Sequence, residues 1–295
     1  MPDFSDQLLN PPANWPNISS SKFITAAGIR WHVQRAGCGP TILLVHGTSG
    51  ATHTWRTVLP LLTPWADVIA FELPGHGFTT GATVEQLSLP GMADAVAALV
   101  RALDAKPRIG VGHSAGAAVL LQLASAHEFK PQSIIGVNSA LIPVNALGQM
   151  LLPLSRALFD TEALQLCAAA VLKSGAVARR LVRSTGSPLG ADQEARYVAL
   201  LADKRRVSAV LGMMTRWDLE ALNATFPRLS VPLTLVHSQN EPWVPFRALL
   251  DATRSVPLRT VIDVTPAGHL IPDEKPQQLA DIIASTFAEI ASRSG

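Results

Sequence analysis

Residues 107–127 read PRIGVGHSAGAAVLLQLASAH, a short apolar strand pattern that runs directly into an apolar helix pattern. The junction, Gly112-His113-Ser114-Ala115-Gly116, fits G-x-S-x-G. A strand that turns sharply into a helix pushes the middle side chain outward, and small residues on either side let strand and helix approach closely. The next backbone N–H then points from the helix N-terminus to where an oxyanion would form. The pattern makes Ser114 a candidate nucleophile and the Ala115 N–H a candidate oxyanion donor.

The same residues also fit a dinucleotide-binding fingerprint, G-x-G-x-x-A, from Gly110 to Ala115. That fingerprint needs an acidic residue at the end of the next strand, where it would hold a ribose hydroxyl. The next strand ends in GVNSA (136–140), which contains no acid. Two strand units also precede the motif, although the fingerprint normally opens its fold. We therefore favour the nucleophile and predict no cofactor.

Strand and helix patterns alternate on both sides of this motif. A hairpin is predicted around Ala27-Gly28, with further strands at 41–47, 66–77, 133–140, 233–239 and 258–264 and helices at 91–104 and 276–292. Apolar strands that alternate with helices indicate an α/β fold, a mostly parallel sheet covered on both faces. Residues 141–215 have helical periodicity without a strand signal, which predicts an inserted helical cap. The core then comprises 1–140 and 216–295, with 1–20 as an irregular N-terminal arm.

A serine nucleophile needs a base, and the base needs an acid that orients it. His269 is the candidate base, because it follows the last strand directly and a loop there would face Ser114. Glu241 is the candidate acid, in the loop after the preceding strand, and Asp218 at the end of the cap is the alternative. The chain order Ser114, Glu241, His269 is that of enzymes built on a strand–nucleophile–helix turn.

The loop after the strand at 41–47 is expected to supply a second oxyanion donor, the N–H of Thr48. Further residues are predicted to line the substrate pocket: His46, Gly47, His113, Met213, Met214, Trp217 and Trp243. A Met/Trp stripe of this kind would roof a pocket, but it also occurs in ordinary cores. The chain has no metal-ligand spacing and no phosphate-binding lysine motif, so we predict no metal site.

Composition excludes several classes of protein. The 295 residues carry 24 basic and 22 acidic side chains, so the total charge does not call for nucleic acid. Hydrophobic residues make up 48% and charged residues 16%, which allows a sizeable core. Cys38 and Cys167 stand alone, and neither a signal peptide nor a membrane span is evident. We expect a cytoplasmic protein that is soluble or peripheral to a membrane.

A family resemblance rests on motifs in a fixed order. HGTSG (46–50), ELPGHG (72–77), GHSAGAA (112–118), NEPWVP (240–245) and PAGHL (266–270) resemble the α/β-hydrolase superfamily over nearly the whole chain. Strings outside those motifs are similar to the hydrolase-like magnesium-chelatase accessory family of bacteriochlorophyll biosynthesis: RWHVQRAG (30–37), LSLPGMA (87–93), STGS (184–187) and LGMMTRWDL (211–219). Glu241 departs from that family, which commonly has Asp at this position.

The resemblance implies a place in the pathway that inserts Mg²⁺ into protoporphyrin, with a tetrapyrrole as apolar substrate and magnesium chelatase as partner. From Lys173 to Arg206 the chain carries eight basic and three acidic residues. A basic, apolar cap would suit the carboxylates of such a molecule or an anionic membrane, although ordinary helix packing explains it equally well. Two hypotheses follow. The protein is a serine hydrolase of an apolar ester, or it is a non-catalytic accessory protein that binds porphyrin or the chelatase.

Overall fold

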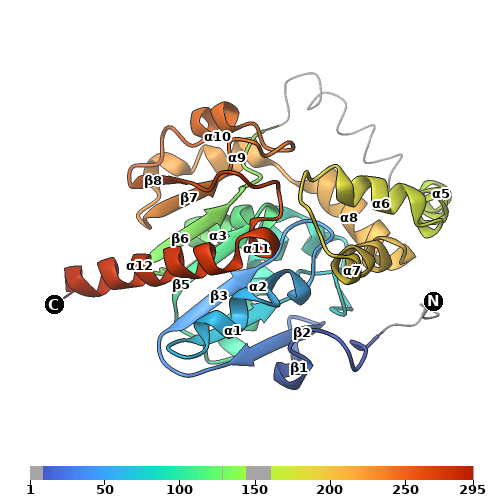
Figure 1. Ribbon diagram of the computed structural model, residues 1–295, viewed down its shortest axis with the longest axis horizontal. Coiled ribbons are helices and arrows are strands. Elements are labelled where there is room, and N and C mark those ends of the chain that lie inside the picture. Colours follow the sequence, from blue (N-terminus) through green and yellow to red (C-terminus); the bar gives the residue numbers. More distant parts are fainter. Residues whose placement is uncertain (1–8, 128, 144–160, 295) are drawn as a thin grey trace.

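The computed structural model describes residues 9–127, 129–143 and 161–294. Within these ranges eight strands form one sheet in the order β1-β2-β4-β3-β5-β6-β7-β8 (Figure 1). Their bounds are β1 (Ser21–Ala26), β2 (Ile29–Ala36), β3 (Thr41–Val45), β4 (Asp67–Phe71), β5 (Pro107–His113), β6 (Ser133–Val137), β7 (Leu233–His237) and β8 (Arg259–Asp263). The pairs β1–β2 and β2–β4 are antiparallel and the other pairs are parallel. The mostly parallel sheet and the hairpin around Ala27-Gly28 are as the sequence predicts.

Helices cover both faces of the sheet. Consecutive side chains of a strand point to opposite faces, so a single strand contributes to two core clusters. Leu43 and Val45 of β3 pack in one core cluster with helices α2 (Leu89–Ala102) and α3 (Ala115–Ala126). Ile42 and Leu44 pack in a second cluster with α1 (Val58–Leu62) and α12 (Pro276–Ser294). The remaining core elements are short: η1 (Ile18–Ser20), η2 (Thr52–Trp55), η3 (Glu85–Leu87), α9 (Leu219–Asn223), η4 (Phe226–Arg228), α10 (Phe246–Ala252) and α11 (Ile271–Glu274).

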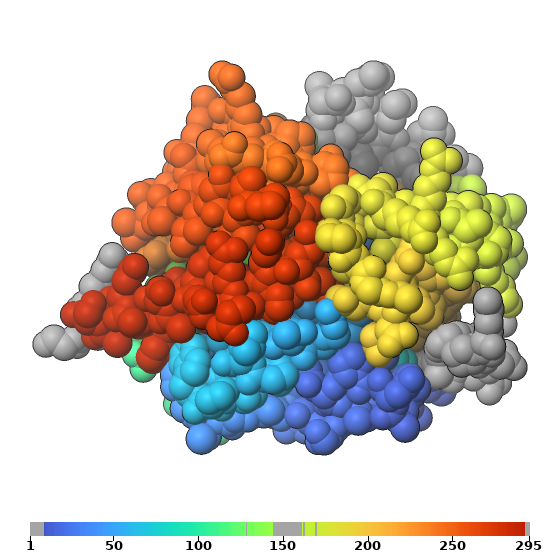
Figure 2. All heavy atoms as spheres, viewed as in Figure 1, coloured from blue at the N-terminus to red at the C-terminus, as the bar shows by residue number. Residues whose placement is uncertain are grey.

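Of the described helices between β6 and β7 in the chain, the first four, called here the cap, gather at one side of the sheet, at the right of Figures 1 and 2. They are α5 (Glu162–Lys173), α6 (Ala176–Arg183), α7 (Ala191–Leu201) and α8 (Lys204–Arg216). They fall in the predicted cap at 141–215, except that α8 runs one residue further; residues 144–160 of that range lie outside the described residues.

A buried polar contact joins this cap to the core. The Tyr197 hydroxyl of α7 donates to Oδ2 of Asp273 in α11 at 2.8 Å. Gln193 of α7 also donates to Asp273, and Arg56 of the core forms an ion pair with it. Burial raises the pKa of Asp273 above its usual value, although Arg56 and the hydrogen bonds oppose this effect. The carboxylate therefore depends on these three donors, two of which hold α7 against α11.

The N-terminal arm and the cysteines complete the description. Trp15 is buried, and its indole N–H donates to the hydroxyl of Thr52 at 2.9 Å, which holds the arm against the core. Cys38 and Cys167 are free and exposed. Across the described ranges, no helix is long and apolar enough to cross a membrane. Within the same ranges no three His, Cys, Asp or Glu side chains are grouped so that they could hold a metal ion.

Candidate active site

Ser114 occupies the turn between β5 and α3, in a backbone conformation that a residue with a side chain rarely adopts (φ 50°, ψ −115°). The two glycines of the motif, Gly112 and Gly116, have no room for a side chain. A Cβ on Gly112 would lie 2.4 Å from the backbone nitrogen of Ala117, and one on Gly116 would lie 2.2 Å from the carbonyl oxygen of Val45. The two glycines therefore allow the close strand–helix approach that the turn requires.

His269 and Glu241 meet at the carboxyl edge of the sheet. Nδ1 of His269 lies 3.0 Å from Oε1 of Glu241, and both side chains are buried. The Glu241 carboxylate also accepts the backbone N–H groups of Trp243, at 2.6 Å, and of Val244. Burial raises the pKa of Glu241, but the hydrogen bond and charge of His269 and the two backbone donors outweigh it, so the pKa lies below its usual value. An ionised Glu241 holds the proton on Nδ1 and leaves Nε2 as the basic atom.

Asp218, the alternative acid, is placed elsewhere. It is exposed at the N-terminus of α9, where its carboxylate accepts the backbone N–H of Ala221 at 2.9 Å. This is the ordinary role of an aspartate that caps a helix. Asp218 therefore stabilises α9, and the geometry favours Glu241 as the partner of His269.

Ser114 and His269 line one cavity of about 350 Å³, called here the catalytic cavity. The core contributes Thr48 to its wall, and the cap contributes apolar side chains such as Leu181. The Ala115 N–H lies in the first turn of α3, where backbone donors have no intrahelical acceptor. In this part of the described structure the Ser114 hydroxyl makes no hydrogen bond to the His269 ring; such bonds are often formed only in the substrate complex.

Four of the predicted pocket residues line the catalytic cavity: Gly47, His113, Met214 and Trp243. Met213 and Trp217 do not. Met213 is buried in the core, whereas its neighbour Met214 is 61% exposed, because one residue along α8 turns the side chain by about 100°. The Trp217 side chain packs against the core, and its indole N–H donates to the carbonyl of Leu87 at 3.1 Å.

His46 is also outside the cavity, and its bonds explain why. Its Nδ1 donates to the carbonyl of Gly47 at 2.7 Å, and its Nε2 accepts the N–H of Leu73 at 3.0 Å. Burial lowers the pKa of His46 well below 6.5, so the ring is neutral. His46 thus joins two loops of the core, and it is Gly47 and Thr48 after it that border the cavity.

Two side chains that the sequence did not single out for this role hold the loop of His269. Nε2 of His113 donates to the backbone carbonyl of His269 at 2.9 Å. Nδ2 of Asn138 donates to the same carbonyl at 2.9 Å and to that of Gly268 at 3.0 Å. Burial lowers the pKa of His113 to about 3, so it remains a neutral donor. In the sequence, only one observation indicates such a role for Asn138. It directly follows β6, which pairs with β5, the strand that ends at Ser114.

Comparison with known proteins shows which proteins the chain is similar to in sequence and in fold. The model of the "Alpha/beta hydrolase family" matches residues 42–282. The "Magnesium-chelatase 30 kDa subunit" of Rhodobacter capsulatus is 32% identical over 278 residues, 92% of this chain and 96% of that protein. A "2-hydroxymuconate semialdehyde hydrolase" of Pseudomonas sp. strain CF600 is 30% identical over 135 residues, 45% of this chain and 47% of that protein. A laboratory-evolved variant of potato epoxide hydrolase has the same fold, with TM-score 0.72 at 17% identity over 91% of this chain and 99% of that one.

Proposed function

The chain belongs to the alpha/beta hydrolase family, and from this premise we propose that it is a serine hydrolase of an ester or related carbonyl in an apolar substrate. The observation that carries the proposal is the 3.0 Å contact between His269 and Glu241 beside a cavity that Ser114 also lines. An imidazole oriented by an ionised carboxylate is the base that a serine hydroxyl needs. The apolar cap side chains in the cavity wall favour an apolar substrate.

The proposed reaction has two steps. Nε2 of His269 takes the Ser114 proton while Oγ bonds to the substrate carbonyl carbon, and the N–H groups of Thr48 and Ala115 stabilise the oxyanion. The tetrahedral intermediate collapses, the C–O bond to the alcohol breaks, and His269 gives its proton to the departing oxygen. His269 then takes a proton from water as the water oxygen bonds to the acyl carbon; the bond from that carbon to Oγ breaks, His269 returns the proton to Ser114, and the acid is released. Glu241 keeps the imidazole oriented and stabilises its protonated form.

The proposed substrate class is a tetrapyrrole of bacteriochlorophyll biosynthesis. This proposal is supported by the likeness to the magnesium-chelatase 30 kDa subunit, which extends over 92% of the chain. A flat apolar molecule with ester or carboxylate substituents would suit an apolar cavity beneath a cap rich in basic residues. The same likeness supports association with magnesium chelatase as a proposed interaction.

That likeness also supports a second candidate function. The relative's name describes a subunit of a chelatase, so the chain could bind porphyrin or the chelatase without catalysis and assist Mg²⁺ insertion. Ser114→Ala separates the two functions. If the folded, abundant variant still supports pigment synthesis, the accessory function is sufficient; if pigment synthesis is lost, the hydroxyl is needed.

We also propose that the cap associates with an anionic membrane surface. Helix α6 exposes two apolar side chains, Val177 and Leu181, beside exposed Arg179 and Arg180. Apolar side chains next to basic ones are typical of helices that lie in a membrane interface. Leu181 also borders the catalytic cavity, so an apolar substrate could pass from the membrane into the site.

Labelling with a fluorophosphonate probe tests the proposed chemistry, because such probes react with an activated serine and hardly with an ordinary one. We expect labelling at Ser114 that is lost in both Ser114→Ala and His269→Ala. The thermal transition of each variant shows whether it is folded. A folded wild-type protein that does not react would contradict the hydrolase proposal and favour the accessory function.

A further inference from the structure

The cap contacts the loop of His269 directly, through the four residues that follow α6. These residues, STGS at 184–187, are called here the cap loop. The two loops approach each other backbone to backbone. A Cβ on Gly268 would lie 2.6 Å from the carbonyl carbon of Gly186 and 2.7 Å from the backbone nitrogen of Ser187. The cap loop therefore leaves no space for a side chain next to His269 in the chain.

Backbone N–H groups of the His269 loop donate to the cap loop. The N–H of His269 itself donates to the carbonyl of Thr185 at 2.8 Å. The N–H of the next residue, Leu270, donates to the hydroxyl of Ser187 at 2.9 Å. Thr185 and Ser187 are buried, and so is the loop of His269. These hydrogen bonds are thus shielded from water, which strengthens them.

Glu274, at the end of α11, adds a third hydrogen bond to this contact. Its Oε1 accepts the N–H of Gly268 at 2.9 Å, and it also accepts the hydroxyl proton of Ser187. Ser187 therefore acts as donor and acceptor at once, as a hydroxyl can. Three consecutive N–H groups, with that of His269 in the middle, are held by the cap loop or by the carboxylate bonded to it.

The core holds the same loop from the other side. The carbonyl of His269 accepts hydrogen bonds from His113 and Asn138, which both belong to the core. The N–H of His269 donates instead to the cap loop. The backbone that carries the imidazole is therefore fixed between core and cap, and its position depends on both.

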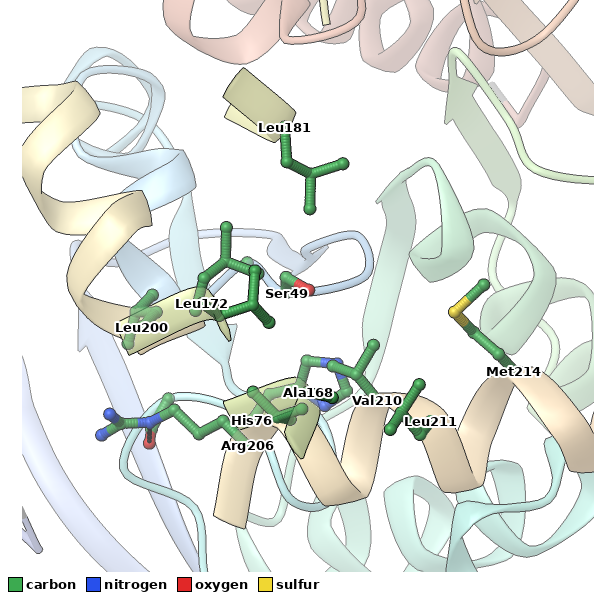
Figure 3. Close-up of a pocket in the computed structure, with 14 residues that line it drawn as sticks. Ser49, His76, Ala168, Leu172, Leu181, Leu200, Arg206, Val210, Leu211 and Met214 are labelled. Atoms are coloured by element: carbon green, nitrogen blue, oxygen red, sulfur yellow. Dashed lines mark hydrogen bonds between the residues drawn. The ribbon is translucent and has the colours of Figure 1, made fainter. Parts of the chain in front are cut away.

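The cap loop and the helix before it also border the substrate space. Thr185 lines the catalytic cavity. Leu181 of α6 lines that cavity and a second one of about 190 Å³ beside it, into which its side chain points in Figure 3. The same short segment of the cap thus forms part of the wall that faces a substrate and holds the backbone of His269.

We propose that the cap loop positions the base His269, with Ser187 and Glu274 as positioning residues that act through the backbone on either side of it. The inference rests on the proposed function, because it takes His269 as the base. Nε2 can take the Ser114 proton only from a narrow range of positions, and a displacement of about 1 Å can cost about 100-fold in rate. Hydrogen bonds that hold three consecutive N–H groups restrict such displacements.

The rate at which a fluorophosphonate probe labels Ser114 tests the proposal, because this rate depends on the base. Ser187→Ala removes the acceptor of the Leu270 N–H and the donor to Glu274. We expect the limiting rate constant of labelling to fall about 10- to 100-fold. The probe concentration that gives half of this rate should stay the same, since the change affects the chemical step and not binding. An unchanged limiting rate constant would overturn the inference.

Glu274 supplies a second pair of variants, which keeps the test decisive if Ser187→Ala fails to fold. Glu274→Ala should also lower the limiting rate constant, because the Gly268 N–H loses its acceptor. Glu274→Gln keeps an acceptor oxygen at the same reach, so it should restore most of the rate. If Glu274→Gln labels as slowly as Glu274→Ala, or if both label like the wild type, the inference is overturned.

Two control variants leave the hydrogen bonds to the His269 loop in place. Ser184→Ala removes a hydroxyl of the same cap loop, which donates to a carbonyl of α6. Gln193→Ala removes a hydrogen bond between α7 and Asp273, so it loosens the cap at another point. Both should be labelled at the wild-type rate. A loss as large as that in Ser187→Ala would show that the stability of the cap alone governs the rate, and it would overturn the inference.

Nuclear magnetic resonance separates a failure of this inference from a failure of the proposed function, because it needs no reaction. The imidazole resonances of His269 are assigned by their loss in His269→Ala. They should shift in Ser187→Ala and stay in place in Ser184→Ala. If these shifts occur in a protein that the probe does not label, the positioning of His269 is supported and only the proposed hydrolase activity is contradicted. Resonances that do not move in Ser187→Ala would overturn the inference.

Discussion

Oε1 of Glu241 lies 3.0 Å from Nδ1 of His269, although 28 residues separate the two along the chain. The same carboxylate accepts the backbone N–H groups of Trp243 and Val244, in its own loop. The sequence resemblance leads us to expect aspartate at this position, and the longer glutamate side chain reaches the imidazole here. Three donors thus fix the carboxylate, and the carboxylate in turn fixes the ring.

Glu241→Gln should lower kcat/KM toward an activated ester by about 10³- to 10⁴-fold, because an amide no longer holds the imidazole in the required tautomer. Glu241→Asp should cost less, about 10- to 100-fold, since a shorter carboxylate keeps its charge and loses optimal placement. Steady-state kinetics on the three proteins measure both effects. Equal activity of Glu241→Gln and wild type would show that Glu241 does not orient the base.

Asp218→Asn is the matched control for Glu241, because asparagine also caps helices well. We expect unchanged kcat/KM for this variant. Asp218→Ala should keep its activity as well. It should lose about 1 kcal/mol of unfolding free energy, because the hydrogen bond from the Asp218 carboxylate to the N-terminus of α9 is removed. Urea denaturation measures that loss. A large drop in kcat/KM for folded Asp218→Asn would reinstate Asp218 as the acid.

Gly116→Ala should destabilise the fold by about 3 kcal/mol or more, because the added methyl group would clash with the backbone carbonyl of Val45. Gly190→Ala is the matched control. Its added Cβ would meet only the end of the Gln193 side chain, at 3.9 Å, and its backbone is in an ordinary conformation. Thermal unfolding should separate the two variants by many degrees. Comparable transition temperatures would contradict the steric account of the turn.

Asn138→Ala should lower kcat more than it raises KM, because it removes both hydrogen bonds that Asn138 makes to the loop of His269. A displacement of the base by about 1 Å can cost about 100-fold in rate. Asn138 would be a positioning residue in this account, so Asn138→Asp, which loses the donors but keeps the size, should show a similar drop. A pure change in KM, or none, would remove Asn138 from the site.

As the pH is lowered, the protein should begin to lose stability at a higher pH than the titration of its carboxylates alone predicts. His53, His76 and His113 are fully buried, and burial lowers their pKa values to about 3, 4 and 3. In the unfolded chain these groups titrate near about 6.5. Between about pH 6.5 and 4 the unfolded chain therefore binds protons that the folded chain does not, and stability falls as pH falls. Above about pH 6.5 all three groups are neutral in both states, so this loss is absent.

The slope is up to about 1.4 kcal/mol per pH unit for each of these histidines. Urea denaturation from about pH 8 to pH 5 measures it. His53→Leu should reduce the slope by the contribution of one histidine, even if the substitution also changes the free energy of unfolding at neutral pH. A free energy of unfolding that stays constant over that pH range would contradict the buried, neutral state of these rings.

Vesicle co-sedimentation tests the proposed membrane surface. We expect binding to vesicles that contain anionic lipid, weaker binding at high salt, and no binding to neutral vesicles. The charge reversals Arg179→Glu and Arg180→Glu together should abolish binding. The matched control reverses Arg101 and Lys106, which are exposed elsewhere in the fold, and it should bind normally. Equal loss in both double variants would assign the attraction to net charge rather than to α6.

Much of the fold could be predicted because its signals are local. The apolar runs of β3, β5 and β6 indicate buried strands, since a parallel strand covered on both faces needs apolar residues at every position. Gly112 and Gly116 predict the sharp turn at Ser114 for a steric reason that reads directly from the chain. Met213 and Met214 could not be separated in this way, because the rotation of α8 against the core decides which of two adjacent methionines faces the cavity.

The sequence by itself determined the alternation of strands and helices, the strained turn at Ser114 and the order of the candidate residues, because each depends on near neighbours in the chain. Only the tertiary structure decided that Glu241 rather than Asp218 reaches His269, and that Asn138 and His113 hold the loop of His269. These relations join segments far apart in sequence, and they are set by where separate strands end along one sheet edge.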